Sequence, residues 1–342
     1  MKVYLDTVEN VLRGGTYKPN RTAVDTISGF SEHYKIDLAE GYPLLTTKQM
    51  DGFRWNSMIH ELFWYLSGDE HVRDLREKTG IWDEWASEAG HLETAYGRFW
   101  RRYPVPETDA RLPGESWTED GSWVNTEETD DGVRRTFDQI GYVLDQLREN
   151  PTSRRIVVNA WHPANAAHSK LPPCHYTFVF NVQGDRLNLH LTQRSADLAL
   201  GVPFNIACYS LLLTMVANET GFEPGTFSHQ LVDAHVYCGT GDRGRWYGEH
   251  LDELQQRLRE VEADPSLSYR DVGGWLEETA PEEGADEEGY DHVPGLLEQL
   301  SREPLDRPEI VIADRPLAEL GADDVELKDY DSHPGIRFAV AE

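Results

Sequence analysis

The sequence predicts a single α+β domain decorated with two insertions. Helix-like and strand-like patterns alternate in irregular order, unlike the strict strand–helix alternation of a doubly wound fold. The length of 342 residues suits one large domain or two ordinary ones. Two stretches stand apart, because residues 103–132 show little periodicity and residues 239–290 are acidic. We therefore expect one domain over residues 1–342, with insertions at about 103–132 and 239–290.

The first hundred residues are predicted to form a helix, paired strands and a second helix. An apolar stripe at helical spacing runs along the start of the chain, in Tyr4, Val8, Val11 and Leu12. Residues 26–38 then alternate as strands do. Residues 55–66 form an apolar helix with a single acidic residue, Glu61.

The predicted elements beyond the first insertion are short and follow one another closely. They are helices at 137–147, 205–218 and 251–261 and strands at 156–161, 176–182, 187–192 and 309–313. Asn205 would stand just before its apolar helix, where the side chain could cap the first turn.

The chain is strongly acidic, with 61 Asp and Glu against 32 Lys and Arg and a net charge of −29. Such a surface repels polyanions, which argues against nucleic acid as the main partner. Self-repulsion of this size is best tolerated in concentrated salt, where the Debye length falls to about 3 Å at 1 M. We therefore expect a protein of a salt-loving organism. An ordinary acidic protein is the alternative that composition leaves open.

Cysteine usage and hydropathy indicate a cytoplasmic protein. The three cysteines, Cys174, Cys208 and Cys238, are too few and too scattered for a disulfide framework, so we expect a reducing compartment. They lack the paired spacing of a metal site, and no metal is expected. The N-terminus has no apolar signal core, and no run of about 18 apolar residues predicts a membrane span.

One short segment brings together groups that a nucleophilic enzyme needs. It holds a thiol, a cation, a hydroxyl, a carboxylate and an amide, in Cys174, Arg194, Ser195, Asp197 and Asn205. A thiolate attacks far better than a thiol, and a nearby cation lowers the pKa of the thiol. A buried, inert cysteine is the alternative. A dyad of Cys174 with His175 is not expected, because neighbours on a strand point to opposite faces.

Two other places carry charge in unusual settings. Arg154 and Arg155 are adjacent, and holding them close together is costly unless an anion lies between them; a solvated turn is the alternative. Glu61 lies in an apolar helix, where burial would raise the pKa of its carboxyl and suit it to proton relay. A paired core acid is the other interpretation.

One side-chain amide and one strand face suggest how the protein could recognise a nucleoside. The carboxamide of Asn205 offers a donor and an acceptor together, which matches the N3–H and O4 of uracil. Asp233, His235 and Tyr237 alternate and would share one strand face. That face could bind a sugar hydroxyl or form a buried polar network.

The whole chain apart from the two insertions resembles the thymidylate synthase family. The resembling segments occur in the family's order, and as an ordered set they are far more specific than any one motif. They are Asn20-Arg21-Thr22, Pro43 to Lys48, Ile59 to Leu62, Ile81 to Trp85, Tyr96-Gly97, Ser153-Arg154-Arg155, Pro173-Cys174-His175, Gln193-Arg194-Ser195, Asp197, Leu200 to Ile206, His235-Val236-Tyr237 and His333 to Ile336.

The resemblance implies a fold, an assembly and a reaction. The fold would be a large mixed β-sheet with flanking helices, and the protein would be a homodimer packed sheet against sheet. Cys174 would attack C6 of dUMP, which makes C5 nucleophilic towards the one-carbon unit of methylenetetrahydrofolate. Loss of the C5 proton and hydride transfer from the folate would give dTMP and dihydrofolate, with no metal.

The resemblance also implies a role for each matching residue. The phosphate of dUMP would be held by Arg21, Arg194 and Ser195, with Arg154 and Arg155 of the other subunit. The base and sugar would be bound by Asn205, His235 and Tyr237. Proton transfers would involve Glu61 and Tyr96. Folate would be contacted by Trp82, Asp197, Gly201 and Phe204, under a C-terminal tail that includes Ala341.

Two departures from the family pattern concern the edges of the site. The segment Ala23 to Asp25 replaces a loop that often contains glycine, and Asp25 beside a phosphate would be unfavourable unless it is turned away. The second insertion separates Tyr237 from the helix that normally follows it. That helix could therefore begin near either His250 or His292.

Two other functions are kept as alternatives. A pyrimidine hydroxymethylase of the same fold would release the adduct to water instead of reducing it. Asn205 argues for a uracil substrate, whereas a carboxylate there would suit cytosine. A catalytically silent nucleotide-binding protein would use the acidic insertions as docking surfaces and would not need Cys174 as a nucleophile.

Overall fold

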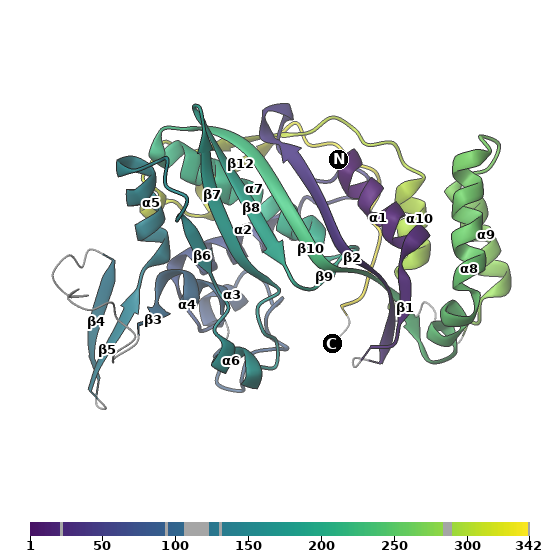
Figure 1. Cartoon of the computed structure of the whole chain (residues 1–342), viewed down its shortest axis with the longest axis horizontal. Coiled ribbons are helices and arrows are strands. Elements are labelled where there is room, and N and C mark those ends of the chain that lie inside the picture. Colours follow the sequence, from purple (N-terminus) through teal and green to yellow (C-terminus); the bar gives the residue numbers. More distant parts are fainter. Residues whose placement is uncertain (21–22, 93–94, 106–122, 130–131, 283–288, 341–342) are drawn as a thin grey trace.

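The computed structural model describes residues 1–20, 23–92, 95–105, 123–129, 132–282 and 289–340. These residues form a large β-sheet with helices packed against it (Figure 1). The sheet has seven strands in the order β1-β2-β10-β8-β7-β6, with β9 paired to β10. Strand β10 runs parallel to β8 and β9, and the other neighbours are antiparallel. The predicted α+β class and mixed sheet are confirmed.

Four strands of this sheet, β2, β6, β7 and β8, match predicted ones, whereas β1 and β9 were not predicted and β10 was anticipated only as a strand face at Asp233 to Tyr237. Their bounds are Thr16–Lys18 (β1), Val24–Asp37 (β2), Val157–Asn159 (β6), His175–Gln183 (β7), Arg186–Gln193 (β8), Ala196–Asp197 (β9) and Glu223–Thr240 (β10). A small separate pair is Glu309–Ile312 (β11) with Val325–Lys328 (β12). Three short 3₁₀ helices are Leu38–Glu40, Leu317–Glu319 and Ala322–Asp324.

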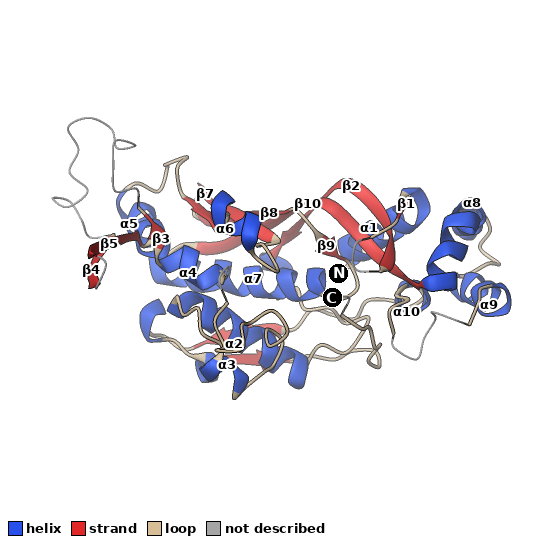
Figure 2. Cartoon of the chain, turned by 90° about the horizontal axis from the view of Figure 1, so that it is seen from below, coloured by secondary structure: helices blue, strands red, loops and turns tan. Residues whose placement is uncertain are grey.

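The α-helices form the second layer and the ends of the molecule. Their bounds are Lys2–Gly14 (α1), Phe53–Ser67 (α2), Arg73–Arg76 (α3), Tyr96–Arg101 (α4), Gln139–Glu149 (α5), Pro163–His168 (α6), Gly201–Thr220 (α7), Gly241–Ala263 (α8), Tyr269–Thr279 (α9) and Val293–Leu300 (α10). Figure 2 shows α7 and α2 on one side of the sheet, whereas α8 and α9 lie at one end.

Helix α7 is the core helix, and its start corrects a prediction. It begins at Gly201, so Asn205 lies in its second turn and does not cap it. Pro203 is tolerated there because the first turn of a helix has N–H groups without intrahelical partners. The helix is long and apolar enough to cross a membrane by length and composition alone. However, 72% of the apolar 18-residue window in this helix is buried inside the protein, as expected for a core helix.

The two predicted insertions contain more regular structure than their sequences indicated. Strands Tyr103–Pro104 (β3), Val124–Thr129 (β4) and Gly132–Phe137 (β5) form a small antiparallel sheet, whereas residues 106–122 and 130–131 lie outside the described part. In the second insertion, α8 is much longer than the predicted helix 251–261. His250 lies inside α8, and His292 is the residue that precedes α10.

The side of the sheet opposite α7 carries polar groups and a few exposed apolar ones. Ser228 lies between two histidines, with its Oγ 3.0 Å from Nε2 of His33 and 2.9 Å from Nδ1 of His190. Phe30 is 84% exposed and Val157 is 39% exposed. These two residues lie on β2 and β6, which three other strands separate, and single exposed apolar side chains are ordinary on a protein surface.

The close approach of α4 to α2 predicts the effect of adding one methyl group. A Cβ at Gly97 would lie 2.4 Å from the carbonyl oxygen of Tyr65. This oxygen belongs to the backbone, so it cannot move aside without a large energetic cost. We expect Gly97→Ala to lower the free energy of unfolding by about 2 kcal/mol, because overpacking outweighs the better helix propensity of alanine. Urea denaturation at fixed salt measures this change.

The matched control is Gly273→Ala in α9, where an added Cβ would meet no atom within 4 Å. There we expect a gain of roughly 0.5–1 kcal/mol from helix propensity alone. Equal effects of the two substitutions would contradict the packing of α4 against α2.

Candidate active site

Cys174 lies in the turn that leads into β7 and is fixed from two sides. Its backbone N–H donates a hydrogen bond to Oη of Tyr96 at 2.7 Å. Its carbonyl oxygen accepts one from the backbone N–H of Arg194 at 2.8 Å. The thiol is half-buried and free of any disulfide. Cys174 is therefore held in place and remains partly exposed.

Arg194 follows the last residue of β8, and its guanidinium is held beside the sulfur. Nε donates to the carbonyl oxygen of Pro173 at 2.9 Å and Nη2 to that of Pro172 at 2.6 Å. Nη2 also lies 3.7 Å from Sγ of Cys174. The structure thus brings together the cation and the thiol that the sequence placed twenty residues apart.

Burial outweighs this cation in setting the pKa of Cys174. Removal from water raises the pKa of the thiol, and Arg194 and the hydroxyl of Tyr96 lower it by less, so the pKa lies above its ordinary value. Arg194 thus lowers the pKa of the thiol as expected, but by less than burial raises it. Of the other predicted arginines, Arg21 lies outside the described residues.

Arg154 and Arg155 lie exposed in the turn between α5 and β6. Their guanidinium groups form no hydrogen bond or ion pair with any other residue that the structure describes. Backbone contacts shape the turn, with the N–H of Arg155 donating to Oγ of Ser153 at 3.2 Å. Two adjacent cations thus point into solvent on a protein that is otherwise rich in acid.

Glu61 has the shifted pKa that its sequence setting predicted. Burial raises the pKa of its carboxyl to about 7, although hydrogen bonds from Tyr65 and Trp82 lower it. Oη of Tyr65 donates to Oε1 of Glu61 at 2.8 Å, and Nε1 of Trp82 donates to the same oxygen at 2.7 Å. A carboxyl with this pKa can both give and take a proton near neutral pH.

Tyr96 connects Cys174 to the aromatic core. Its ring stacks on that of His175, with centroids 3.8 Å apart and an angle of 2° between the planes. Nδ1 of His175 is 2.6 Å from Oη of Tyr209. Burial lowers the pKa of His175 to about 3, so the ring is neutral. His175 is thus engaged with the core, in agreement with the expectation that it forms no dyad with Cys174.

Asp197, Gly201 and Asn205 lie together where β9 leads into α7. Oδ1 of Asp197 accepts from the N–H of Ala199 at 2.8 Å and of Leu200 at 3.3 Å. A Cβ at Gly201 would be 3.8 Å from Oδ1 of Asn205 and 3.9 Å from Cβ of Asp197. The amide of Asn205 forms no hydrogen bond with the other described residues, so it is available to a ligand.

The ionised state of Asp197 is favoured by its neighbours. Burial would raise the pKa of its carboxyl, but His292, His235 and the N–H of Ala199 together hold that pKa below its ordinary value. Nδ1 of the fully buried His292 lies 3.7 Å from Oδ1 of Asp197. Asp197 is therefore an anion at neutral pH.

The polar face predicted on β10 is present. Nδ1 of His235 lies 3.3 Å from Oδ1 of Asp233, and the rings of His235 and Tyr237 are 5.2 Å apart. Asp233 also accepts hydrogen bonds from Ser28 and Lys18. These contacts, above all the one with His235, lower the pKa of Asp233. The face is a polar network that still presents Tyr237 at its end.

The residues that the resemblance assigned to folate lie on several different elements. Trp82 is buried with its ring 5.6 Å from that of Trp85, and Phe204 is half-buried in the first turn of α7. The tail reaches the same region, because the carbonyl oxygen of Ala339 lies 2.9 Å from Nε2 of His292. Ala341 lies outside the described residues.

Asp25, at the departure from the family loop, is held by local contacts. Its carboxylate accepts a hydrogen bond from Oη of Tyr17 at 2.6 Å and a weaker one from the N–H of Asn20 at 3.3 Å.

A family model of thymidylate synthases matches residues 2–342. A thymidylate synthase of Haloferax volcanii is 65% identical over 338 residues, which cover 98% of this chain and 96% of that protein. The chain belongs to the thymidylate synthase family. It is a methyltransferase that converts dUMP to dTMP with methylenetetrahydrofolate as co-substrate. The predicted family and reaction are confirmed, and the halophilic source of the relative accords with the acidic composition.

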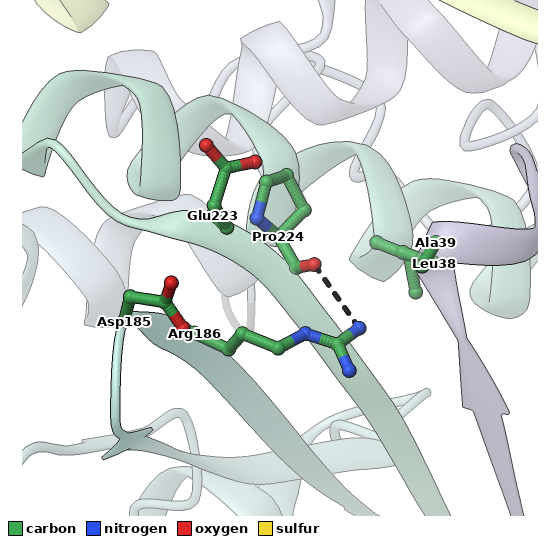
Figure 3. A pocket seen from close by; sticks show the side chains of 6 residues that line it. All are labelled: Leu38, Ala39, Asp185, Arg186, Glu223 and Pro224. Carbon is green, nitrogen blue, oxygen red and sulfur yellow. Dashed lines mark hydrogen bonds between the residues drawn. The ribbon is translucent and has the colours of Figure 1, made fainter.

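A hollow of about 470 Å³ at the far end of β8 and β10 is a different feature of this synthase. It is lined by Leu38, Ala39, Asp185, Arg186, Glu223 and Pro224 (Figure 3). Arg186 is already engaged there, with Nη1 3.2 Å from Oδ2 of Asp37 and Nη2 3.4 Å from the carbonyl oxygen of Pro224. None of the predicted site residues lines this hollow.

Sequence reasoning missed three residues next to the site of the synthase. Tyr65 is four residues after Glu61, a spacing that places two side chains on one helix face. Lys48 is buried, donates to the carbonyl oxygen of Ala199, and has a pKa that burial lowers to about 7. His292 gave no local signal, because its partners come from distant parts of the chain.

The environment of Cys174 predicts how alkylation depends on pH. Because only the thiolate reacts, the rate with iodoacetamide should rise with pH, and its midpoint reports the pKa of the thiol. Arg194→Gln should move that midpoint up by about one unit, the effect of losing a nearby opposite charge. Mass spectrometry at a series of pH values measures the modified fraction.

The control variant is Arg186→Gln, whose guanidinium belongs to the distant hollow and should not move the midpoint. Cys208 and Cys238 are 2% and 0% exposed and should stay unmodified in the folded protein. A midpoint that is the same with and without Arg194 would contradict the proximity of its guanidinium to the sulfur.

Proposed function

We propose that Cys174 is the nucleophile of thymidylate synthesis and that Arg194 positions and stabilises its thiolate. The observation that carries this proposal is the 3.7 Å contact between Nη2 of Arg194 and Sγ, made by a guanidinium that two backbone carbonyls hold still. In the reaction the thiolate adds to C6 of dUMP, and the electron pair moves to C5 and O4. C5 then bonds to the one-carbon unit of the folate.

The remaining steps form the methyl group and regenerate the thiol. C5 loses its proton, and the bond between the one-carbon unit and the folate nitrogen breaks, which leaves that carbon on C5 as a methylene group. A hydride from the tetrahydrofolate then reduces the methylene group to a methyl group. The C6–S bond breaks, so the products are dTMP, dihydrofolate and the regenerated thiol. Glu61, with a pKa near 7, relays protons towards O4, and Tyr96 assists removal of the C5 proton.

In this proposal the residues that match the family around this thiol bind the two substrates. The free amide of Asn205 pairs with N3–H and O4 of uracil, and His235 with Tyr237 holds the sugar hydroxyl. Arg194, Ser195 and Arg21 hold the phosphate. Folate lies against Trp82, Asp197, Gly201 and Phe204, with Ala341 in the tail that covers it.

In this proposal the enzyme is a homodimer and acts in the cytoplasm. Each subunit is one domain with two insertions. The sheet face opposite α7 is the proposed contact, and its support is that the chain belongs to the thymidylate synthase family. Arg154 and Arg155 then enter the phosphate site of the other subunit. Their support is the exposed pair of guanidiniums without partners among the described residues. An anion between them would remove their mutual repulsion.

The role of Cys174 is tested with Cys174→Ser, incubated with dUMP and methylenetetrahydrofolate in molar salt. Turnover, followed by the absorbance of dihydrofolate, should fall by on the order of 10³-fold or more, because a hydroxyl is a far weaker nucleophile at neutral pH. Binding of dUMP, measured by calorimetry, should persist. An unchanged rate would refute the assignment.

Product analysis of the unaltered enzyme separates this reaction from hydroxymethylation. Formation of dTMP together with dihydrofolate is the expected result, and recovery of hydroxymethyl-dUMP would contradict it.

The dimer proposal predicts that two inactive variants restore activity to each other. Cys174→Ser and Arg155→Ala subunits, unfolded together and refolded, should regain up to about a quarter of normal activity. Random pairing makes half of the dimers mixed, and each mixed dimer has one complete site. A light-scattering mass and a dihydrofolate assay in the same buffer give the result.

The matched control pairs Cys174→Ser with Arg194→Gln. Arg194 contacts Cys174 of its own subunit, so no mixed dimer has a complete site and no activity should return. Recovery in the control, or its absence with Arg155→Ala, would contradict the sharing of sites.

A further inference from the structure

The carboxyl of Glu61 is held asymmetrically. Oη of Tyr65 and Nε1 of Trp82 both donate to Oε1, at 2.8 Å and 2.7 Å. Oε2 forms no hydrogen bond with the residues that the structure describes, and it is not among the fully buried polar atoms without partners. One oxygen is thus fully engaged, whereas the other has no partner among the described residues and is not fully buried.

Two donors on one oxygen determine where the proton of this carboxyl resides. An oxygen that already accepts an O–H and an N–H hydrogen has no room for a proton of its own without losing one of them. The protonated carboxyl therefore carries its hydrogen on Oε2. The two donors also stabilise the ionised form, which opposes the effect of burial on the pKa of Glu61.

The other groups that face Glu61 add no charge at neutral pH. They are Tyr96 from α4 and Cys208 and Tyr209 from α7, and burial raises the pKa of each. Tyr65 itself is 1% exposed and has its pKa raised by the same cause. The two hydrogen bonds are therefore the main stabilisation of the carboxylate among the described residues.

We propose that Tyr65 is a positioning residue that, together with Trp82, occupies Oε1 of Glu61 and so confines the exchangeable proton to Oε2. This inference rests on the proposed role of Glu61 as a proton relay. Tyr65 lies one helical turn after Glu61 on α2, so the orientation is built into a single rigid element. A phenylalanine would fill the same space and leave Oε1 with one donor.

The test is Tyr65→Phe, followed by infrared titration of the unliganded enzyme. The carboxylic acid band that persists near neutral pH is assigned to Glu61 by its absence in Glu61→Gln. Loss of one hydrogen bond to the charged form should raise the midpoint of this band by about one pH unit. An unchanged midpoint would overturn the proposal.

Tyr34→Phe is the matched control. Tyr34 is equally a buried tyrosine with a hydrogen bond, 2.7 Å from Oη to Nδ1 of His229, but it lies on β2. Its loss should leave the midpoint of the Glu61 band where it is, and a shift of the same size would overturn the proposal. If Tyr65→Phe fails to fold by circular dichroism, Trp82→Phe removes the second donor and should shift the midpoint in the same direction.

The pH profile of kcat/KM separates this proposal from the proposed role of Glu61. If a limb of the kcat/KM profile moves to higher pH together with the infrared midpoint in Tyr65→Phe, both the positioning by Tyr65 and the relay role of Glu61 are supported. A shifted infrared midpoint with an unmoved limb keeps the contact of Tyr65 with Glu61 and overturns the relay role of Glu61. A limb that moves while the midpoint does not would overturn the positioning by Tyr65.

Discussion

Two backbone carbonyls, those of Pro172 and Pro173, fix the guanidinium of Arg194 beside the sulfur of Cys174. A guanidinium donates in one rigid plane, so bonds from Nε and Nη2 leave it little freedom. The two residues lie at the adjoining ends of β7 and β8, which are antiparallel neighbours with His175 opposite Gln193. Ordinary strand pairing therefore brings nucleophile and cation together, and the rest of the site is arranged around them.

Charge in this synthase is organised on two length scales. At long range the acidic surface repels dUMP and folate, which are both anions, so cations near the site must dominate the local field. Most arginines elsewhere are paired, as Arg76 is with Asp83 at 2.5 Å. The pair Arg154 and Arg155 has no such partner among the described residues, which leaves its charge available to a phosphate. Concentrated salt screens the distant repulsion more than these short contacts.

Local patterns predicted the longer helices α1, α2, α5 and α7 and four strands of the main sheet, but they could not predict which elements are neighbours in space. The start of α7 was missed because Gly201 to Pro203 reads as a turn, although proline is acceptable in the first turn of a helix. The contact of Cys174 with Arg194 was anticipated from their segment. The places of Lys48 and Tyr65 were not, since burial of a lysine and the sharing of one carboxylate oxygen depend on packing that no local pattern encodes.

His292 couples three parts of the chain that the sequence keeps far apart. Arg243 of α8 forms a buried ion pair with Asp291, from Nε to Oδ2 at 2.8 Å, and so anchors the residue just before His292. Nε2 of His292 must carry the hydrogen that the carbonyl oxygen of Ala339 accepts. Nδ1 then faces Asp197. The second insertion, the tail and the proposed folate-binding carboxylate therefore meet at one buried ring, and displacing any of them changes the surroundings of the other two.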